Sequence, residues 1–154
     1  MTNDSYKRMM PEMPMSKEFE KLQPGVARNP YLRFLGIELL DAGEGWVKMK
    51  LPFRPELLQP HVVHGGAIYS LADTAAAHSL LTITFPVEGA TTVEQRINFL
   101  KAMREGDLFC EARVVHLGKT LAYTEATLTT SDGTLVAKSA ATQMRLDTAR
   151  WTRK

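Results

Sequence analysis

The second half of the chain alternates between apolar and polar residues in short segments. These segments are residues 91–100, 108–117, 121–130 and 135–146. Such alternation is typical of strands that bury one face, because neighbouring side chains of a strand point to opposite sides. Turn-forming residues separate the segments, and Asp132-Gly133 is a strong hairpin signal. We therefore expect four strands that pair through turns.

A helical pattern precedes these strands, at residues 65–81. Apolar and small residues recur there at helical spacing, namely Ile68, Leu71, Ala72, Ala75, Ser79 and Leu80. The many alanines make the predicted helix thin, so that other backbone can approach it closely. A thin apolar helix suits the centre of a sheet that wraps around it.

The beginning of the chain predicts two short helices. Ser16 is a suitable N-cap for a helix through Leu22, which Pro24-Gly25 would end. A second helix at residues 29–35 has Pro30 near its start, where proline is tolerated. We expect residues 1–15 to form a mobile arm or an oligomer contact.

Residues 37–40 and 46–51 flank a glycine-containing turn, which predicts a β-hairpin before the long helix. The resulting order β-β-α-β-β-β-β predicts an α+β fold, in which an antiparallel sheet curls around one helix. One curled sheet leaves open edges, so we expect two subunits to pair. The expected organisation is an N-terminal arm with a short helix (1–28), one domain (29–146) and a basic tail (147–154).

Composition narrows the classes of protein. Hydrophobic residues make up 44% of the chain, charged residues 23%, and the net charge is +2, which gives no reason to expect nucleic-acid binding. Cys110 is the only cysteine, which excludes an intrachain disulfide and a cysteine-based zinc site. No apolar signal-peptide core or membrane-spanning run is present, so we expect a cytoplasmic protein. The basic residues near the C-terminus predict a frayed, solvated end: Arg145, Arg150, Arg153 and Lys154.

The start of the long helix is the first candidate for chemistry. Gly65 and Gly66 open it directly after His64. The first N–H groups of a helix lack intrahelical acceptors and carry the positive end of its dipole, and glycine lets a ligand approach them. Such a helix start can hold a carbonyl oxygen and the negative charge it gains in a transition state. A plain glycine-rich helix entry has the same sequence.

Asp73 lies two turns further along, among alanines. A carboxylate in an apolar helix needs a partner or a role. It could lie at a solvated edge or hydrogen-bond to the sheet. It could also activate water as a general base, or attack an acyl group itself.

The segment as a whole resembles a known family. His64-Gly65-Gly66-Ala67-Ile68, followed by Leu71-Ala72-Asp73-Thr74-Ala75, is similar to the signature of the PaaI-like (phenylacetate-pathway) acyl-CoA thioesterases of the hotdog superfamily. Similar segments extend the resemblance from about residue 29 to residue 145, including those at 55–58, 106–107, 117–122 and 132–137. The resemblance implies a hotdog fold and hydrolysis of a thioester to free CoA and a carboxylic acid.

The resemblance also implies roles for individual residues. Asp73 would be the base or the nucleophile, and the Gly65 N–H would bind the thioester carbonyl oxygen in the partner subunit's site. His64 would shape the site, and Thr92 would place the water or the carboxylate. The substrate would be an acyl-CoA, with no cofactor, nucleic acid or membrane as partner. The assembly would be a homodimer paired into a homotetramer.

Further residues are candidates for substrate binding. The resemblance places the hairpin turn Gly118-Lys119-Thr120 at the nucleotide end of CoA, where Lys119 would pair with phosphate. Arg96 and Arg104 are additional candidates for phosphate. The acyl group would enter a tunnel between subunits, lined by central-helix and N-terminal residues, and the candidates near it are Gly66, Tyr69, Tyr31, Phe34 and Leu35.

One position departs from the family pattern. Leu58 stands where the family commonly has an asparagine, six residues before the histidine. Gln59 has the amide chemistry to hold a water or a carbonyl and could substitute. The departure supports an alternative function, a non-catalytic hotdog protein that binds an acyl or aromatic ligand. A hydratase or dehydratase would need a different arrangement of histidine and acid, which we do not find.

The remaining polar candidates have simpler interpretations. His61 and His64 have a spacing that metal ligands can have, but no further ligand set accompanies them, so we expect no metal. His78 and His116 are expected to be structural. Ser70 lacks the Gly-x-Ser-x-Gly setting of a hydrolase nucleophile.

Overall fold

A computed structural model describes residues 15–151, and the predicted arm at residues 1–14 lies outside the described residues. The elements follow the predicted order of two strands, one long helix and four strands. They are α1 (Lys17–Arg28), α2 (Pro30–Leu35), β1 (Glu38–Gly43), β2 (Trp46–Leu51), the 3-10 helix η1 (Pro55–Leu57), α3 (Gly65–Thr84), β3 (Glu88–Phe99), β4 (Leu108–Leu117), β5 (Leu121–Thr130), β6 (Leu135–Asp147) and α4 (Thr148–Trp151).

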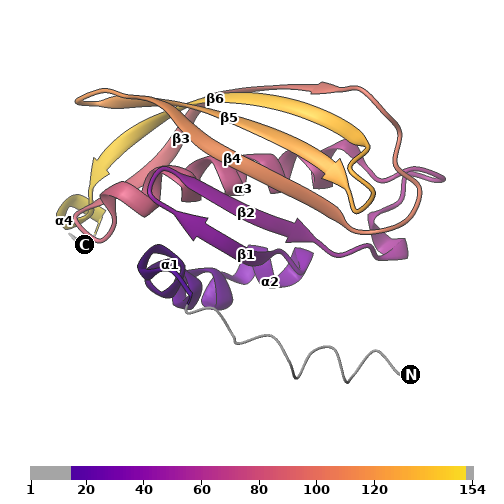
Figure 1. The fold of residues 1–154 in the computed structure, drawn as a ribbon, viewed down its shortest axis with the longest axis horizontal. Coiled ribbons are helices and arrows are strands. Elements are labelled where there is room, and N and C mark those ends of the chain that lie inside the picture. Colours follow the sequence, from indigo (N-terminus) through magenta and orange to yellow (C-terminus); the bar gives the residue numbers. More distant parts are fainter. Residues whose placement is uncertain (1–14, 152–154) are drawn as a thin grey trace.

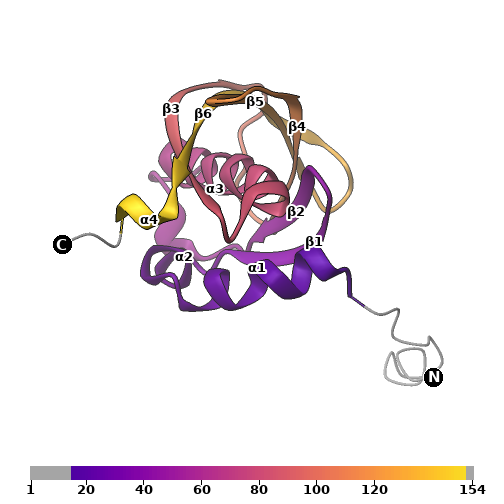
Figure 2. The same ribbon diagram turned by 90° about the vertical axis from the view of Figure 1, so that its left-hand side faces the viewer.

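The strands form one antiparallel sheet in the order β1-β2-β4-β5-β6-β3. The sheet arches over α3 (Figure 1), and the end-on view shows α3 enclosed between the sheet and the N-terminal helices (Figure 2). Strands β1 and β3 are the two edges of the sheet. The predicted α+β arrangement, with a sheet wrapped around one central helix, is confirmed.

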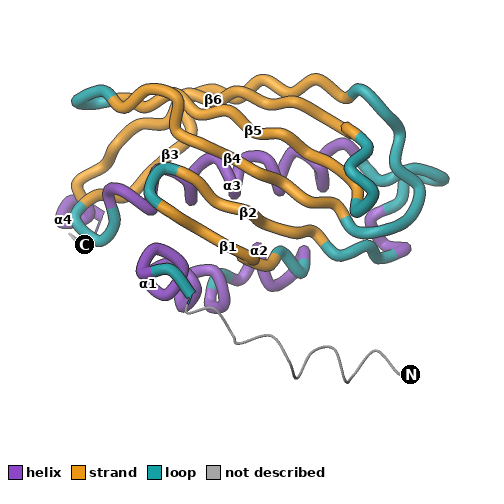
Figure 3. The backbone as a smooth tube through the Cα atoms, in the orientation of Figure 1, coloured by secondary structure: helices purple, strands orange, loops and turns teal. Residues whose placement is uncertain are grey.

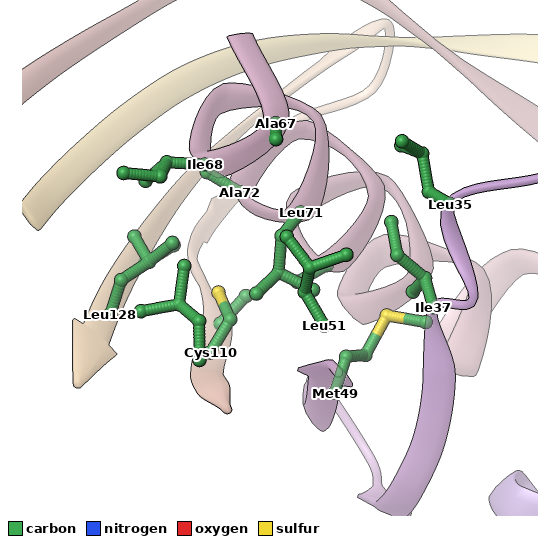
Figure 4. Close-up of a cluster of buried hydrophobic side chains, with 14 of the residues drawn as sticks. Leu35, Ile37, Met49, Leu51, Ala67, Ile68, Leu71, Ala72, Cys110 and Leu128 are labelled. Atoms are coloured by element: carbon green, nitrogen blue, oxygen red, sulfur yellow. The ribbon is translucent and has the colours of Figure 1, made fainter. Parts of the chain in front are cut away.

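The core of the fold lies between α3 and the inner face of the sheet. Leu71, Ala72 and Ala75 of α3 are fully buried, as are Met49 and Cys110 on the strands that cover them. Figure 4 shows Leu71 among side chains from β2, β4 and the segment that leads into β1. The small residues of α3 therefore do what their pattern predicts, since they let the strands approach the helix axis.

Helix α1 differs from its prediction at its C-terminal end. Ser16 caps the helix as expected, its hydroxyl accepting a hydrogen bond from the Phe19 N–H at 3.0 Å. The predicted stop at Pro24-Gly25 is wrong, because the helix continues to Arg28. Proline removes one hydrogen bond, but Val26 is buried in the core just beyond it, and packing outweighs that loss.

The C-terminal part also differs from its prediction. Arg145 does not belong to a frayed end, since it lies within β6 and its Nε donates to Glu88 Oε2 at 2.7 Å. Its Nη1 donates to the Gly118 carbonyl, also at 2.7 Å, and so ties the β4–β5 turn to the end of the sheet. Figure 3 shows β6 running the length of the molecule to α4. Within residues 15–151, no helix is long and apolar enough to cross a membrane.

Candidate active site

A pocket of about 430 Å³ lies between α2 and α3. Residues at the start of α2 form one wall and the middle of α3 forms the other. The side chains that matter for chemistry are Tyr31, Tyr69, Ser70, Asp73 and His78. Of the residues expected in an acyl tunnel, Tyr31 lines this pocket. Leu35 is buried in the core (Figure 4) and Phe34 is 72% exposed.

Asp73 is held by a hydrogen bond from the sheet. Thr92 of β3 donates from Oγ1 to Asp73 Oδ1 at 2.6 Å. The same Oγ1 lies 3.2 Å from Oε1 of Gln143, a fully buried residue that faces Thr92 across the β3–β6 pairing. The structure therefore brings Asp73 and Thr92 together, and the carboxylate has a partner while it stays open to the pocket.

Two tyrosines line the pocket together with the carboxylate. Burial raises the pKa of Tyr69, and the negative charges of Asp73 and Glu94 raise it further, so its phenol stays protonated at neutral pH. Tyr31 lies 2.7 Å from Ser70 Oγ, which itself donates to the Gly66 carbonyl at 2.8 Å. The Ser70 proton is thus committed to the backbone, and Tyr31 donates to the serine. Ser70 is a structural link between α2 and α3.

His78 lines the pocket one turn beyond Thr74. Its Nδ1 lies 2.8 Å from the Thr74 carbonyl, an acceptor, so Nδ1 carries the proton and Nε2 has the lone pair. Burial lowers the pKa of His78, opposed by the Thr74 bond and by the charge of Asp73. The imidazole is therefore neutral at neutral pH.

The start of α3 has one free backbone donor. His64 caps the helix, and its Nδ1 accepts the Gly66 N–H at 2.8 Å. A Cβ on residue 66 would lie 2.9 Å from that nitrogen, so the cap depends on glycine. In the part of the chain that the structure describes, the Gly65 N–H has no acceptor. The positive end of the α3 dipole is therefore presented through Gly65.

Comparison with known proteins identifies the family. The model of the thioesterase superfamily matches residues 61–137, which include all of α3 and the strands β3, β4 and β5. This chain belongs to the thioesterase superfamily. A protein of Saccharolobus solfataricus, provisionally named an esterase, is 30% identical over 137 residues, which is 88% of each chain.

Solved structures confirm the hotdog fold of this thioesterase-superfamily member. A thioesterase family protein from Silicibacter pomeroyi is 29% identical with a TM-score of 0.78, over 84% of this chain and 98% of that one. The E. coli PaaI protein from the phenylacetic acid degradation operon has the same TM-score at 23% identity, over 84% and 94%. The resemblance to PaaI-like proteins of the hotdog superfamily is thereby confirmed.

A single chain of this superfamily member does not assemble all the predicted site residues. Asp73 follows Gly65 by eight residues, which is about 12 Å along the helix axis. Gln59 is exposed in the loop before α3, where its N–H donates to the Val62 carbonyl at 2.6 Å. Lys119 is exposed on the β4–β5 turn, which Arg145 ties to β6 through the Gly118 carbonyl. Arg96 and Arg104 are exposed and line separate surface hollows.

Gln143 is the residue near Asp73 that the sequence analysis missed. It shares the inner face of β6 with Ala137, Ser139 and Ala141, all buried. A glutamine in the buried register of an alternating strand is the signal that could have found it, because such an amide must be hydrogen-bonded. Among residues 15–151, no group of His, Cys, Asp and Glu side chains is arranged to hold a metal ion.

Proposed function

We propose that this protein is an acyl-CoA thioesterase that hydrolyses a thioester to free CoA and a carboxylic acid. The observation that carries the proposal is the pair Asp73–Thr92. The carboxylate of a helix that has no other Asp, Glu, Lys or Arg is fixed by a hydroxyl at 2.6 Å and lines a pocket of about 430 Å³. Membership of the thioesterase superfamily supports hydrolysis as the reaction.

The complete site requires two copies of the chain in this proposal. Gly65 and Asp73 lie about 12 Å apart along one helix, too far to act on one carbonyl group. Strand β3 is an edge strand, and Val93 and Phe99 on it are 55% and 52% exposed. Pairing of two β3 strands would cover these side chains and place Gly65 of one subunit against Asp73 of the other. A homodimer is therefore the minimal unit, and pairing of two dimers would give a homotetramer.

The chemistry divides between the two residues. The Gly65 N–H and the α3 dipole polarise the thioester carbonyl and stabilise the oxyanion that forms. Asp73 takes a proton from water as the water attacks the carbonyl carbon, or it attacks that carbon itself to give a mixed anhydride that water then cleaves. In both routes the C–S bond breaks, the sulfur of CoA receives a proton, and water supplies the new carboxyl oxygen.

Other residues would bind the substrate. The acyl group would enter the pocket beside α3, with Tyr69 and Gly66 near its entrance, and His64 would hold the helix start in place. Gly118, Lys119 and Thr120 would meet the nucleotide end of CoA, where the Lys119 ammonium would pair with phosphate. Gln59 would hold the attacking water or the carbonyl in place of the family asparagine.

The test is a panel of short, medium, long and aromatic acyl-CoA esters, with a thiol reagent to detect free CoA. The native chain should release thiol from at least one ester. Asp73→Asn should lower kcat by about 10²–10⁴-fold with an unchanged unfolding midpoint. Glu125→Gln, which removes the same charge from an exposed position on β5, should leave kcat unchanged. Near-native turnover by Asp73→Asn would refute the assignment.

The second candidate function is a non-catalytic hotdog protein that binds an acyl or aromatic ligand. The observation that favours it is Leu58 at the family asparagine position, with Gln59 exposed in the loop before α3. Saturable binding of an acyl-CoA, measured by calorimetry, together with no thiol release from any ester of the panel, would establish this alternative.

A further inference from the structure

A buried amide stands directly behind the Asp73–Thr92 pair. Gln143 is fully buried, and its Oε1 lies 3.2 Å from Thr92 Oγ1. Within the described part of the chain, its Nε2 is buried without an acceptor. Its neighbours on the same face of β6 are alanines and a serine, which suffice for packing against α3. A long amide in this place needs a separate reason.

Counting protons at Thr92 gives that reason. A threonine hydroxyl has a single proton to donate. Asp73 Oδ1 is charged and lies at 2.6 Å from Thr92 Oγ1, whereas the amide of Gln143 is neutral and lies at 3.2 Å. The Thr92 hydroxyl therefore donates its hydrogen bond to Asp73. The Thr92 oxygen then has only lone pairs to offer Gln143, and it needs a donor there.

Turning the amide over satisfies this requirement. Its two ends have nearly the same shape, so Nε2 can take the place of Oε1, at 3.2 Å from Thr92 Oγ1. Nε2 then has an acceptor, and the end left over is a carbonyl oxygen. In protein interiors, an unpaired carbonyl oxygen is tolerated better than an unpaired N–H.

We propose that Gln143 is a positioning residue, which acts on Asp73 through Thr92. Its amide donates to the Thr92 oxygen, and the Thr92 hydroxyl donates to the carboxylate. The chain of two hydrogen bonds joins β6, β3 and α3, and each bond polarises the next. Gln143 thereby fixes the direction of the Thr92 proton, and this fixes the orientation of the carboxylate that attacks or activates water. The role in turnover rests on the proposed thioesterase function.

The primary test is Gln143→Met, which keeps the length of the side chain and removes the donor. We expect kcat to fall about tenfold and KM to stay within about twofold, because Gln143 does not touch the substrate. Gln143→Leu serves as a second variant if the methionine chain does not fold. The decisive comparison is with Thr92→Val: because Gln143 acts only through Thr92, the double variant should have the kcat of Thr92→Val alone.

Thr124→Val is the matched control. Thr124 is also fully buried on the inner face, on β5, and its hydroxyl donates to the Ala141 carbonyl at 3.2 Å, away from Asp73. We expect its kcat to be unchanged. The proposal is overturned if Gln143→Met keeps the native kcat. It is also overturned if Gln143→Met lowers kcat by the same factor in the native chain and in the Thr92→Val chain.

Failure of the proposed function gives a different result. If the native chain cleaves no thioester, the same four chains, native, single variants and double variant, are compared by urea unfolding. Non-additive stabilities would still support the Gln143–Thr92 bond, because the two side chains then lose one shared interaction. Additive stabilities would overturn it.

Discussion

The inner face of the sheet has two chemically different halves. On β2, β4 and β5 it presents mainly apolar side chains, such as Met49, Cys110 and Leu128, which are fully buried, and the buried hydroxyl of Thr124 on β5 bonds only to the backbone of β6. On β6 and β3 it presents Gln143 and Thr92, which lead to Asp73. One sheet therefore does two things for one helix: the apolar half holds α3 in place, and the polar half orients the one acid of its middle turns.

Helix geometry explains why both halves are needed. Leu71 and Asp73 are two residues apart, which is about 200° around a helix with 3.6 residues per turn. Leu71 therefore faces the apolar strands (Figure 4) while Asp73 faces β3. A helix enclosed by a sheet can therefore have one side that serves only packing and another side that carries a reactive group, even when little of the helix is exposed.

Leu128→Ala should break the apolar half and give the largest effect on stability. Leu128 is fully buried on β5, so its truncation leaves a cavity and should cost about 2–5 kcal/mol of unfolding free energy. Urea unfolding measures this loss. The kcat per folded molecule should stay near the native value, and a large fall in kcat would show that the two halves are not independent.

Cys110→Ser should cost less, about 1–3 kcal/mol, because it places a hydroxyl in an apolar surrounding. Burial raises the pKa of the Cys110 thiol, so the reactive thiolate is absent from the folded chain at neutral pH. Alkylation should therefore proceed only through opening of the fold. Rapid labelling of the folded chain by iodoacetamide would contradict the burial of Cys110 in the apolar half.

Acid should weaken the fold through His78. Burial lowers the pKa of His78 in the folded chain, so the unfolded chain binds the proton first as the pH falls below about 6.5. Stability is then lost with falling pH, by at most about 1.4 kcal/mol per pH unit for this one proton. His78→Gln should lose less stability than the native chain between pH 7 and pH 5. Parallel curves for the two chains would exclude this role.

The smallest effect is expected outside both halves, at Lys119. Lys119→Ala on the exposed β4–β5 turn should raise KM for acyl-CoA several-fold, about 1 kcal/mol, and leave kcat and stability unchanged. Raising the salt concentration should reduce the difference, since the contact is electrostatic. An unchanged KM would show that Lys119 does not contribute to CoA binding.

Most of the fold could be predicted because each element has a local pattern. The bounds of β4 and β5 match their alternation, and α3 starts at the predicted glycine. The end of α1 could not be predicted, because Pro24 is a local stop signal and the burial of Val26 is a tertiary effect. Arg145 lies in a strand that was predicted, but its contacts could not be, since its partners Glu88 and Gly118 are distant in sequence.

The candidate site was predictable only in part. Asp73 and Gly65 stand out within one segment, and the family pattern points to Thr92. Gln143 has no such pattern, and its importance depends on the pairing of β6 with β3, which sets it opposite Thr92. A contact between strands is fixed by register, and single-sequence patterns define strands better than they define register.

The two borders of the sheet are unequal. Helix α1 packs against β1, and the Ser16 hydroxyl donates to the Ala42 carbonyl there, whereas no helix among residues 15–151 covers the outer edge of β3 (Figure 2). Joining two molecules through β3 would create a longer sheet, in which the edge strand at each end is a β1 covered by α1. Growth by strand addition would stop at two molecules, so the geometry that completes a catalytic centre would also protect the protein from forming fibres.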